Sequence, residues 1–259
     1  MRILFIGDIV AKVGRDAVKK SLKNLIKEHQ IDVVIANGEN ATHGRGLTRK
    51  HYQQLIEMGI NVVTLGNHFD DRQEIRDYIE KTAVLVRPLN LIEQYPGKGS
   101  VVFTHKGIKI RVTNLLLEAF MKRPVESPFA SLSMLLNEVE PSIHIVDVHG
   151  EATAEKLALA YAFDGRVSAM LGTHTHVQTR DYQVLPLGTA YISDVGMTGP
   201  KNGVIGVEKN SVIQKMWFNK ETHYVYDNKD EGLLSAVVID VDEESAKAKD
   251  IYPIYLTVR

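Results

Sequence analysis

Acidic, amide and imidazole side chains recur directly after short apolar segments of this sequence. Five such segments are followed in order by Asp8, by Glu39-Asn40, by Asn67-His68, by His149, and by His174 with His176. If the apolar segments are strands of an open α/β sheet, these side chains meet at the edge where ligand sites form. Carboxylate, amide and imidazole ligands without thiolate suit Mn, Fe or Zn better than Ca or copper. The residue types and their order therefore predict a metal site.

Each of these positions, taken alone, also has a purely structural explanation. Asp8 after a glycine is typical of a turn or a helix cap, and a turn also accounts for Glu39. His149 fits a hydrogen-bonded core histidine. His174 and His176 are harder to explain in this way, because two imidazoles separated by one residue can serve two adjacent ions if the backbone is not fully extended. Since a structural explanation must account for every strand end independently, the sequence favours metal binding.

The elements that must position these residues follow one repeated pattern, in which short β-branched segments alternate with amphipathic segments of helical length. This pattern is typical of an α/β fold with two mixed sheets covered by helices. Thr48 fits a helix N-cap, and Gly59 fits the end of the same helix. No linker or internal repeat divides the chain, so residues 1–259 are predicted to form a single domain. Strands are predicted over residues 2–7, 32–36, 61–65, 101–105, 108–113, 143–148, 167–171, 233–241 and 251–258, and helices over residues 15–29, 48–58, 71–80, 129–139 and 153–162.

Composition excludes several classes of protein. The chain has no cysteine, which rules out disulfides, thiolate metal sites and a cysteine nucleophile. Its 31 basic and 32 acidic residues leave a net charge of −1, so there is no excess of basic residues for binding a long nucleic acid or an anionic membrane. The first apolar run, residues 3–6, is too short for a signal peptide or a membrane span. The sequence therefore predicts a soluble, cytoplasmic protein, and a homo-oligomer is compatible with it.

The same positions carry a resemblance to a known family. Their order resembles the five-block signature of binuclear metallophosphoesterases. Val10 stands where the wider superfamily has a histidine, and Glu39 replaces its bridging aspartate; both departures favour one branch, the YmdB-like bacterial phosphodiesterases. The segments similar to that branch are ILFIGDIV, ANGENATHGRGLT, TLGNH, HGEATAEKLAL, GTHTHVQT and YISDVGMTGP. The resemblance implies a metallophosphoesterase-like four-layer sandwich, with two mixed β-sheet layers flanked by helices.

The resemblance also implies a role for each site residue. It implies two divalent or mixed-valence metal ions per chain, Fe or Mn first and Zn as the alternative. His68, next to a ligand but not itself one, would donate a proton to the leaving oxygen after attack by a hydroxide that bridges the ions. Asp70 is left without a role. The first ion would be held by Asp8, Glu39, Asn40 and His176, and the second by Glu39, Asn67, His149 and His174, with Glu39 bridging both.

The activity that the resemblance implies is metal-dependent hydrolysis of a phosphoric diester. The substrates would be small cyclic nucleotides, both 2′,3′-cyclic and 3′,5′-cyclic monophosphates. A phosphomonoesterase or RNA nuclease that uses the same site is the alternative enzyme, and a nucleotide-sensing regulator without turnover is the non-enzymatic alternative. For substrate binding, His43 and Phe69 are the candidates, although Phe69 also fits core packing. Residues 195–199 receive no assignment.

Overall fold

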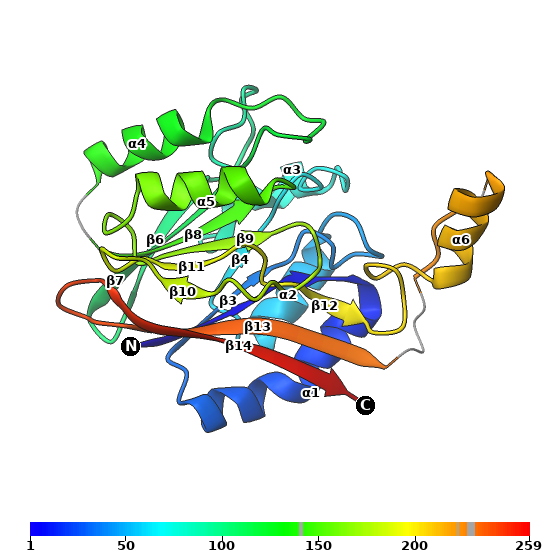
Figure 1. Ribbon diagram of the computed structural model, residues 1–259, viewed down its shortest axis with the longest axis horizontal. Helices are drawn as coiled ribbons and strands as arrows, with labels where there is room; N and C mark the ends of the chain where they lie inside the picture. Colours follow the sequence, from blue (N-terminus) through cyan, green and yellow to red (C-terminus); the bar gives the residue numbers. More distant parts are fainter. Residues whose placement is uncertain (140–141, 222, 227–230) are drawn as a thin grey trace.

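The computed structural model describes residues 1–139, 142–221, 223–226 and 231–259, and it contains two β-sheets (Figure 1). The first sheet consists of β1 (Arg2–Ile6), β2 (Asp8–Ile9), β3 (Val33–Asn37), β4 (Val62–Thr64), β5 (Leu85–Val86), β12 (Met197–Pro200), β13 (Gly232–Val241) and β14 (Ala248–Val258). The second consists of β6 (Ser100–His105), β7 (Ile108–Leu116), β8 (Ile143–His149), β9 (Ala169–Thr173), β10 (Gln183–Val184) and β11 (Ala190–Ile192).

Parallel pairing in the middle of each sheet aligns the strands that precede the predicted site residues. The first sheet has the order β2-β12-β13-β1-β3-β4-β5, with β14 paired to β13, and β1, β3, β4 and β5 run parallel. The second has the order β10-β11-β9-β8-β7-β6, in which β11, β9, β8 and β7 run parallel. Each sheet therefore brings several carboxyl ends to one edge, where ligand sites form in α/β proteins.

Helices cover the outer face of each sheet. α1 (Ala11–His29), α2 (Arg49–Glu57) and α3 (Ile75–Tyr78) pack on the first sheet, and α4 (Pro128–Glu138) and α5 (Thr153–Ala162) pack on the second (Figure 1). Successive side chains of a strand point to opposite faces. Along β1, Ile3 and Phe5 accordingly enter the core between the sheets, while Leu4 and Ile6 enter the core beneath α1. The layers are helix, sheet, sheet and helix, which confirms the predicted fold class.

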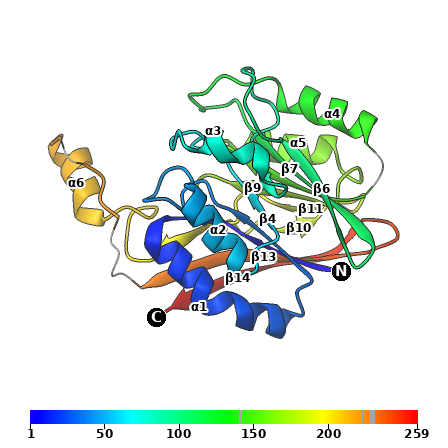
Figure 2. The same cartoon turned by 180° about the vertical axis from the view of Figure 1, so that it is seen from behind.

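One helix stands apart from these layers. α6 (Lys209–Phe218) projects from the side of the molecule (Figure 2). No element was predicted between residues 172 and 232, where the described part of the chain contains α6 and the short strands β10, β11 and β12. Among the described residues, no helix combines the length and the apolar character needed to cross a membrane.

Most predicted elements are present with shifted ends. The N-cap at Thr48 is confirmed, because its side chain accepts a hydrogen bond from the amide of His51. The helix predicted over residues 71–80 is wrong, since α3 has a single turn and continues as a 3₁₀ helix over Ile79–Lys81. The residues before α3 form turns, and the side chain of Asp71 there is bound to His68 rather than capping a helix.

A buried histidine between β7 and β8 leads to a prediction about acid stability. His144 is 2% exposed, and its Nε2 lies 2.8 Å from Thr113 Oγ1. Burial, with a smaller contribution from Arg111, lowers the pKa of His144 to about 3. Below about pH 6.5 the unfolded chain therefore binds one proton more than the folded chain, so stability falls as the pH falls toward 3, by about 1.4 kcal/mol per pH unit.

His144→Gln keeps a hydrogen-bond donor but removes the titrating group. We expect the free energy of unfolding of the unchanged chain to drop by about 2 kcal/mol more than that of the variant between pH 7.5 and pH 5. Urea denaturation at both pH values measures this difference. Equal drops in the two proteins would contradict the prediction. Both proteins contain the other histidines, so the contributions of those residues to the pH dependence cancel in the difference.

Candidate metal centre

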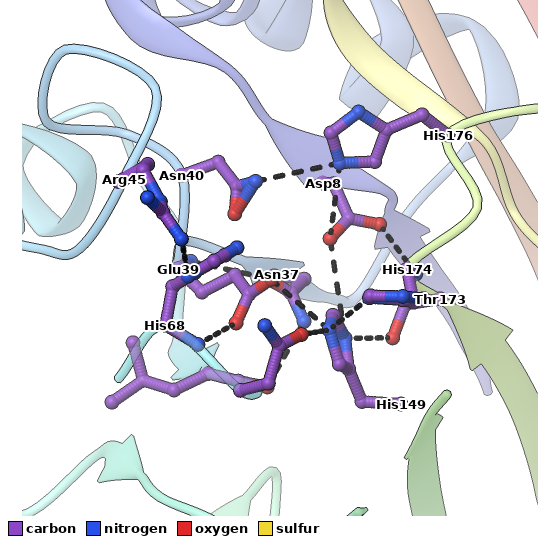
Figure 3. Close-up of polar contacts among 12 residues, drawn as sticks. Asp8, Asn37, Glu39, Asn40, Arg45, His68, His149, Thr173, His174 and His176 are labelled. Carbon is purple, nitrogen blue, oxygen red and sulfur yellow. Dashed lines mark hydrogen bonds and ion pairs between the residues drawn. The ribbon is translucent and has the colours of Figure 1, made fainter. Parts of the chain in front are cut away.

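One half of the site is a group of ligand atoms around the imidazole of His149. Its Nε2 lies 3.0 Å from Glu39 Oε1 and 3.1 Å from His174 Nδ1 (Figure 3). The same nitrogen lies 2.9 Å from Asn67 Oδ1. Glu39, His149 and His174 each bring a ligand atom within 4.8 Å of the other two. A ring nitrogen carries at most one proton, so a single proton cannot satisfy three neighbours of this kind. A cation at this point would satisfy all of them.

The other half of the site gathers Asp8, Asn40 and His176. The side-chain oxygens Asp8 Oδ1 and Asn40 Oδ1 are buried and have no hydrogen-bond partner among the described residues. His176 Nε2 lies 3.9 Å from Asp8 Oδ1 and 3.4 Å from Asn40 Nδ2. Buried polar atoms without partners destabilise a protein and are rare unless they serve a ligand. The donor set of two oxygens and one imidazole fits a second divalent ion.

Hydrogen bonds on the far side of two imidazoles direct their lone pairs into the site. His149 Nδ1 lies 2.8 Å from Thr173 Oγ1, which itself donates to Asp147 Oδ1 at 2.6 Å. Because that hydroxyl proton is already used, Nδ1 of His149 is the donor. Nδ1 of His176 donates to the carbonyl oxygen of Ile205 at 2.9 Å. In both rings Nε2 is left for the site, the arrangement typical of metal-binding histidines.

The loop between the two histidines after β9 has an unusual backbone. His174 and His176 have φ values of 101° and 67°, so the segment is not extended, as their joint use in one site requires. The amide between them donates to Asp194 Oδ2 at 2.9 Å. Lys156 Nζ donates to that carboxylate at 3.2 Å and to the carbonyl before His174 at 2.8 Å. Lys156 and Asp194 are each 1% exposed, and together they brace the loop.

Two close backbone approaches shape the base of the site. A Cβ on Gly66 would lie 2.4 Å from Glu39 Oε2 and 2.5 Å from His149 Nε2, so a larger residue would fill the place of a ligand. The segment 195–199, which had no assignment, contributes to β12 and pairs with β2 in the register Met197 to Asp8. This pairing holds Asp8 at the sheet edge.

The charges in the site depend strongly on one another. Burial raises the pKa of Asp8. Burial also disfavours the charge on Glu39, but the neighbouring His149 lowers the pKa of Glu39 to about 2. Burial opposes a charge on His149, yet Glu39 and Asp8 raise the pKa of His149 to about 9. Burial and then His149 lower the pKa of His174 to about 3. In the protein alone, a proton on His149 thus offsets the negative charge of the Glu39 and Asp8 carboxylates. A bound cation would supply that positive charge in place of the proton.

His68 lies beside the ligand group, and its backbone amide contacts that group. Its amide donates to Glu39 Oε2 at 2.9 Å. In its ring, Nδ1 lies 2.9 Å from Asp71 Oδ2, a carboxylate oxygen that also binds Arg45 Nε at 3.1 Å. Asp71 was missed as a site residue because it was assigned to a helix; its spacing of three residues from His68 was the available signal. A pocket of about 630 Å³ opens at His68 and Asn67.

The structure does not bring the two substrate-binding candidates to this pocket. His43 is exposed and lines a different pocket, together with His51. Phe69 is only 1% exposed, and its ring packs edge-on against Tyr95 at 4.8 Å. The ring is therefore enclosed by protein, as the packing interpretation expects. Asp70 binds Arg123 Nη2 at 2.7 Å and accepts a hydrogen bond from Tyr95 at 2.6 Å, so it holds the pocket wall together.

Two solved structures are similar to this chain over nearly its whole length. A phosphatase from Mycoplasma pneumoniae has a TM-score of 0.94 and 38% identity, covering 99% of this chain and 93% of that one. A structure from Thermus thermophilus, described as a hypothetical protein, has a TM-score of 0.93 and 38% identity, with both chains fully covered. The fold and the carboxylate–imidazole centre thus define a hydrolase of the metallophosphoesterase type.

Similarity over nearly the whole chain narrows this class to one family. A protein of Bacillus subtilis (strain 168) named 2′,3′-cyclic-nucleotide 2′-phosphodiesterase is 45% identical over 259 residues, covering 99% of this chain and 97% of that protein. The chain belongs to the YmdB-like protein family, whose model matches residues 4–254.

Proposed function

We propose that the chain is a binuclear-metal phosphodiesterase that hydrolyses 2′,3′-cyclic nucleotides, with 3′,5′-cyclic monophosphates as further substrates. The observation that carries this proposal is the pair of ligand groups, one around His149 and one around Asp8, adjacent to a pocket that His68 lines. The activity named for the Bacillus subtilis relative supports the choice of substrate. Since both sheets contribute ligands, residues 1–259 are proposed to act as one domain.

The proposed ligands form two sets, one for each group of neighbouring side chains. One ion would be held by Asp8, Asn40 and His176, the other by Asn67, His149 and His174, with Glu39 between them. Their oxygen and imidazole donors suit Fe or Mn, with Zn as the alternative. Ions bound there would neutralise a phosphodiester and lower the pKa of water toward about 7, which supplies a nucleophile near neutral pH.

His68 is proposed as the general acid. Asp71 accepts a hydrogen bond from the Nδ1–H of His68, which leaves Nε2 as the position that can carry a transferable proton. When the bond between phosphorus and the leaving oxygen breaks, that proton passes from Nε2 to the oxygen. The carboxylate of Asp71 fixes the orientation of the ring beforehand. The pocket is lined by Arg45, Lys122 and Arg123 against the acidic Asp71 and Glu93, and this excess of basic residues favours an anionic substrate.

Metal content measured together with turnover tests the proposal. After reconstitution with Mn or Fe, elemental analysis is expected to find roughly two ions per chain. The loaded protein is expected to hydrolyse 2′,3′-cyclic nucleotides faster than phosphomonoesters or RNA, and chelation is expected to abolish this turnover. Asp8→Asn combined with Glu39→Gln is the matched control that removes both sites.

Three outcomes would overturn the proposed function. Fewer than one ion per chain would exclude a binuclear centre. Faster hydrolysis of monoesters or RNA would make the chain a phosphomonoesterase or a nuclease. Nucleotide binding without product after long incubation would make it a regulator.

A further inference from the structure

The pocket beside His68 extends into an apolar end that the metal centre does not explain. Asn67, His68 and His174 line the end next to the ligands. Five apolar residues give another part of the wall its apolar surface, here called the apolar end, although Glu93, Lys122 and Arg123 from the same two segments line the pocket as well: Leu91, Ile92, Phe120, Met121 and Pro124. Its volume of about 630 Å³ is in the range of small-molecule sites, which combine apolar walls with a few polar groups. A substrate with its phosphate at the metal centre would therefore extend a less polar part into this end.

Phe120 is the aromatic side chain of the apolar end, and it is unusually presented. It is 87% exposed, whereas aromatic rings in water normally gain free energy by burial. Its φ is 63°, a backbone conformation that bulky residues rarely adopt. Such conformations persist where surrounding contacts enforce them, and they cluster at ligand sites.

Contacts from α5 enforce this conformation. The two carboxylate oxygens of Glu155 accept hydrogen bonds from the amides of Glu118 and Ala119, each at 3.0 Å. The amide of Met121 donates to the carbonyl of Glu118 at 3.2 Å and closes the turn around Phe120. The ring is thus held at the tip of a turn that is fixed on both sides.

The opposite part of the apolar wall is tied to the same loop. Asn90 Nδ2 donates to the carbonyls of Leu116 and Glu126, each at 2.8 Å. The amide of Glu126 donates to the carbonyl of Asn90 at 2.9 Å, and Leu91 forms a bridge with Val125. The loops that carry Ile92 and Phe120 are therefore joined, and the apolar end exists before any substrate binds.

We propose that Phe120 is the platform on which the nucleobase of the substrate stacks. The inference rests on the proposed function, because it requires a phosphate at the metal centre and a base at the other end of the ligand. Phe120 lines the same pocket as Asn67, His68 and His174, so a single ligand in that pocket can contact both the ring and the ligand group. Since every base presents a π-face, a stacking platform selects for nucleotides over other phosphodiesters and discriminates little among bases.

A base-free substrate separates stacking from catalysis. The rate constant kcat/KM is measured for adenosine 2′,3′-cyclic phosphate and for methyl riboside 2′,3′-cyclic phosphate. For Phe120→Ala we expect about a tenfold fall on the nucleotide, about 1.4 kcal/mol, and little change on the base-free compound. Phe120→Trp is expected to retain the kcat/KM of the unchanged protein on the nucleotide. Phe120→Leu, which is apolar without a π-face, is expected to lose it. Tyr255→Ala, which removes an exposed ring on β14, is the control and is expected to change neither rate.

Binding measurements distinguish failure of this inference from failure of the proposed function. An equal fall on both substrates, or no fall on the nucleotide, would overturn the role of Phe120. If the unchanged protein hydrolyses neither substrate, the proposed function fails, and calorimetric binding of AMP and ribose 5-phosphate then decides the question. AMP binding that is about tenfold weaker in Phe120→Ala, with unchanged binding of ribose 5-phosphate, supports the platform, and equal affinities in both proteins overturn it.

Discussion

Replacing His68 by alanine is expected to lower the turnover of 2′,3′-cyclic nucleotides by about 10²–10⁴-fold while the metal content stays close to that of the unchanged chain. The loss follows from the leaving group. A sugar alkoxide leaves poorly unless it is protonated as the bond to phosphorus breaks, and the ring of His68, oriented by Asp71 at 2.9 Å, is the proposed donor. A protein without that ring has only water to supply the proton.

The metal content is expected to survive because of how His68 contacts the ligands. Its amide, not its ring, donates to Glu39 Oε2 at 2.9 Å. Alanine retains that amide, so the position of the Glu39 carboxylate is preserved. A substitution at His149, whose ring nitrogen lies among three ligand atoms, is expected to lose metal instead.

Two substrates with different leaving groups make the test specific for a proton donor. An ester with a nitrophenol leaving group needs little protonation, so His68→Ala is expected to slow it far less than a cyclic nucleotide. His29→Ala is the matched control, because His29 lies far from the site. It is the last residue of α1, a 19-residue helix, and the site lies at the other end, where the amide of Ala11 donates to the carbonyl of Asn40. Loss of metal together with activity would show that His68 is a ligand, and equal slowing of both esters would exclude it as the acid.

Residues that follow parallel strands were the part of the site that sequence could predict. A strand that ends in an open α/β sheet delivers its next residues to a common edge, so the order of strand ends determines which residues meet. All seven predicted ligands lie at that edge. Their division into two groups was not available from strand order alone, because it depends on how the two sheets face each other across the core.

The contacts that support the ligands were not predicted, for a different reason. Asp71, Lys156 and Asp194 are charged residues whose positions look like ordinary helix or turn surface in the sequence. Lys156 and Asp194 meet only through tertiary folding, 38 residues apart. Phe69 and Phe120 show that burial in a loop could not be predicted either. Both occur in loops, but the ring of Phe69 is buried and that of Phe120 is exposed. Burial of loop residues is decided by packing, which local pattern does not report.

Replacing Lys156 by methionine is expected to destabilise the protein and weaken metal binding together. The substitution keeps an apolar chain of similar length but removes the charge that Asp194 faces at 3.2 Å. Both side chains are 1% exposed, and removing one member of a buried ion pair costs about 3–5 kcal/mol. Asp194 also accepts a hydrogen bond from the amide of Thr175, so the loop that carries both imidazoles is expected to relax.

Metal affinity at matched stability decides whether Lys156 positions the ligands or merely stabilises the fold. Leu22→Ala is the comparison, because Leu22 is 1% exposed in the core beneath α1 and its truncation costs about 2–5 kcal/mol without touching the site. Unfolding by urea establishes that the two variants are similarly destabilised, and calorimetry with Mn then measures their affinity for metal. A clearly weaker affinity in Lys156→Met than in Leu22→Ala is expected, because only the former releases the His174–His176 loop. Equal metal affinities in the two variants would show that the Lys156–Asp194 ion pair contributes only to stability.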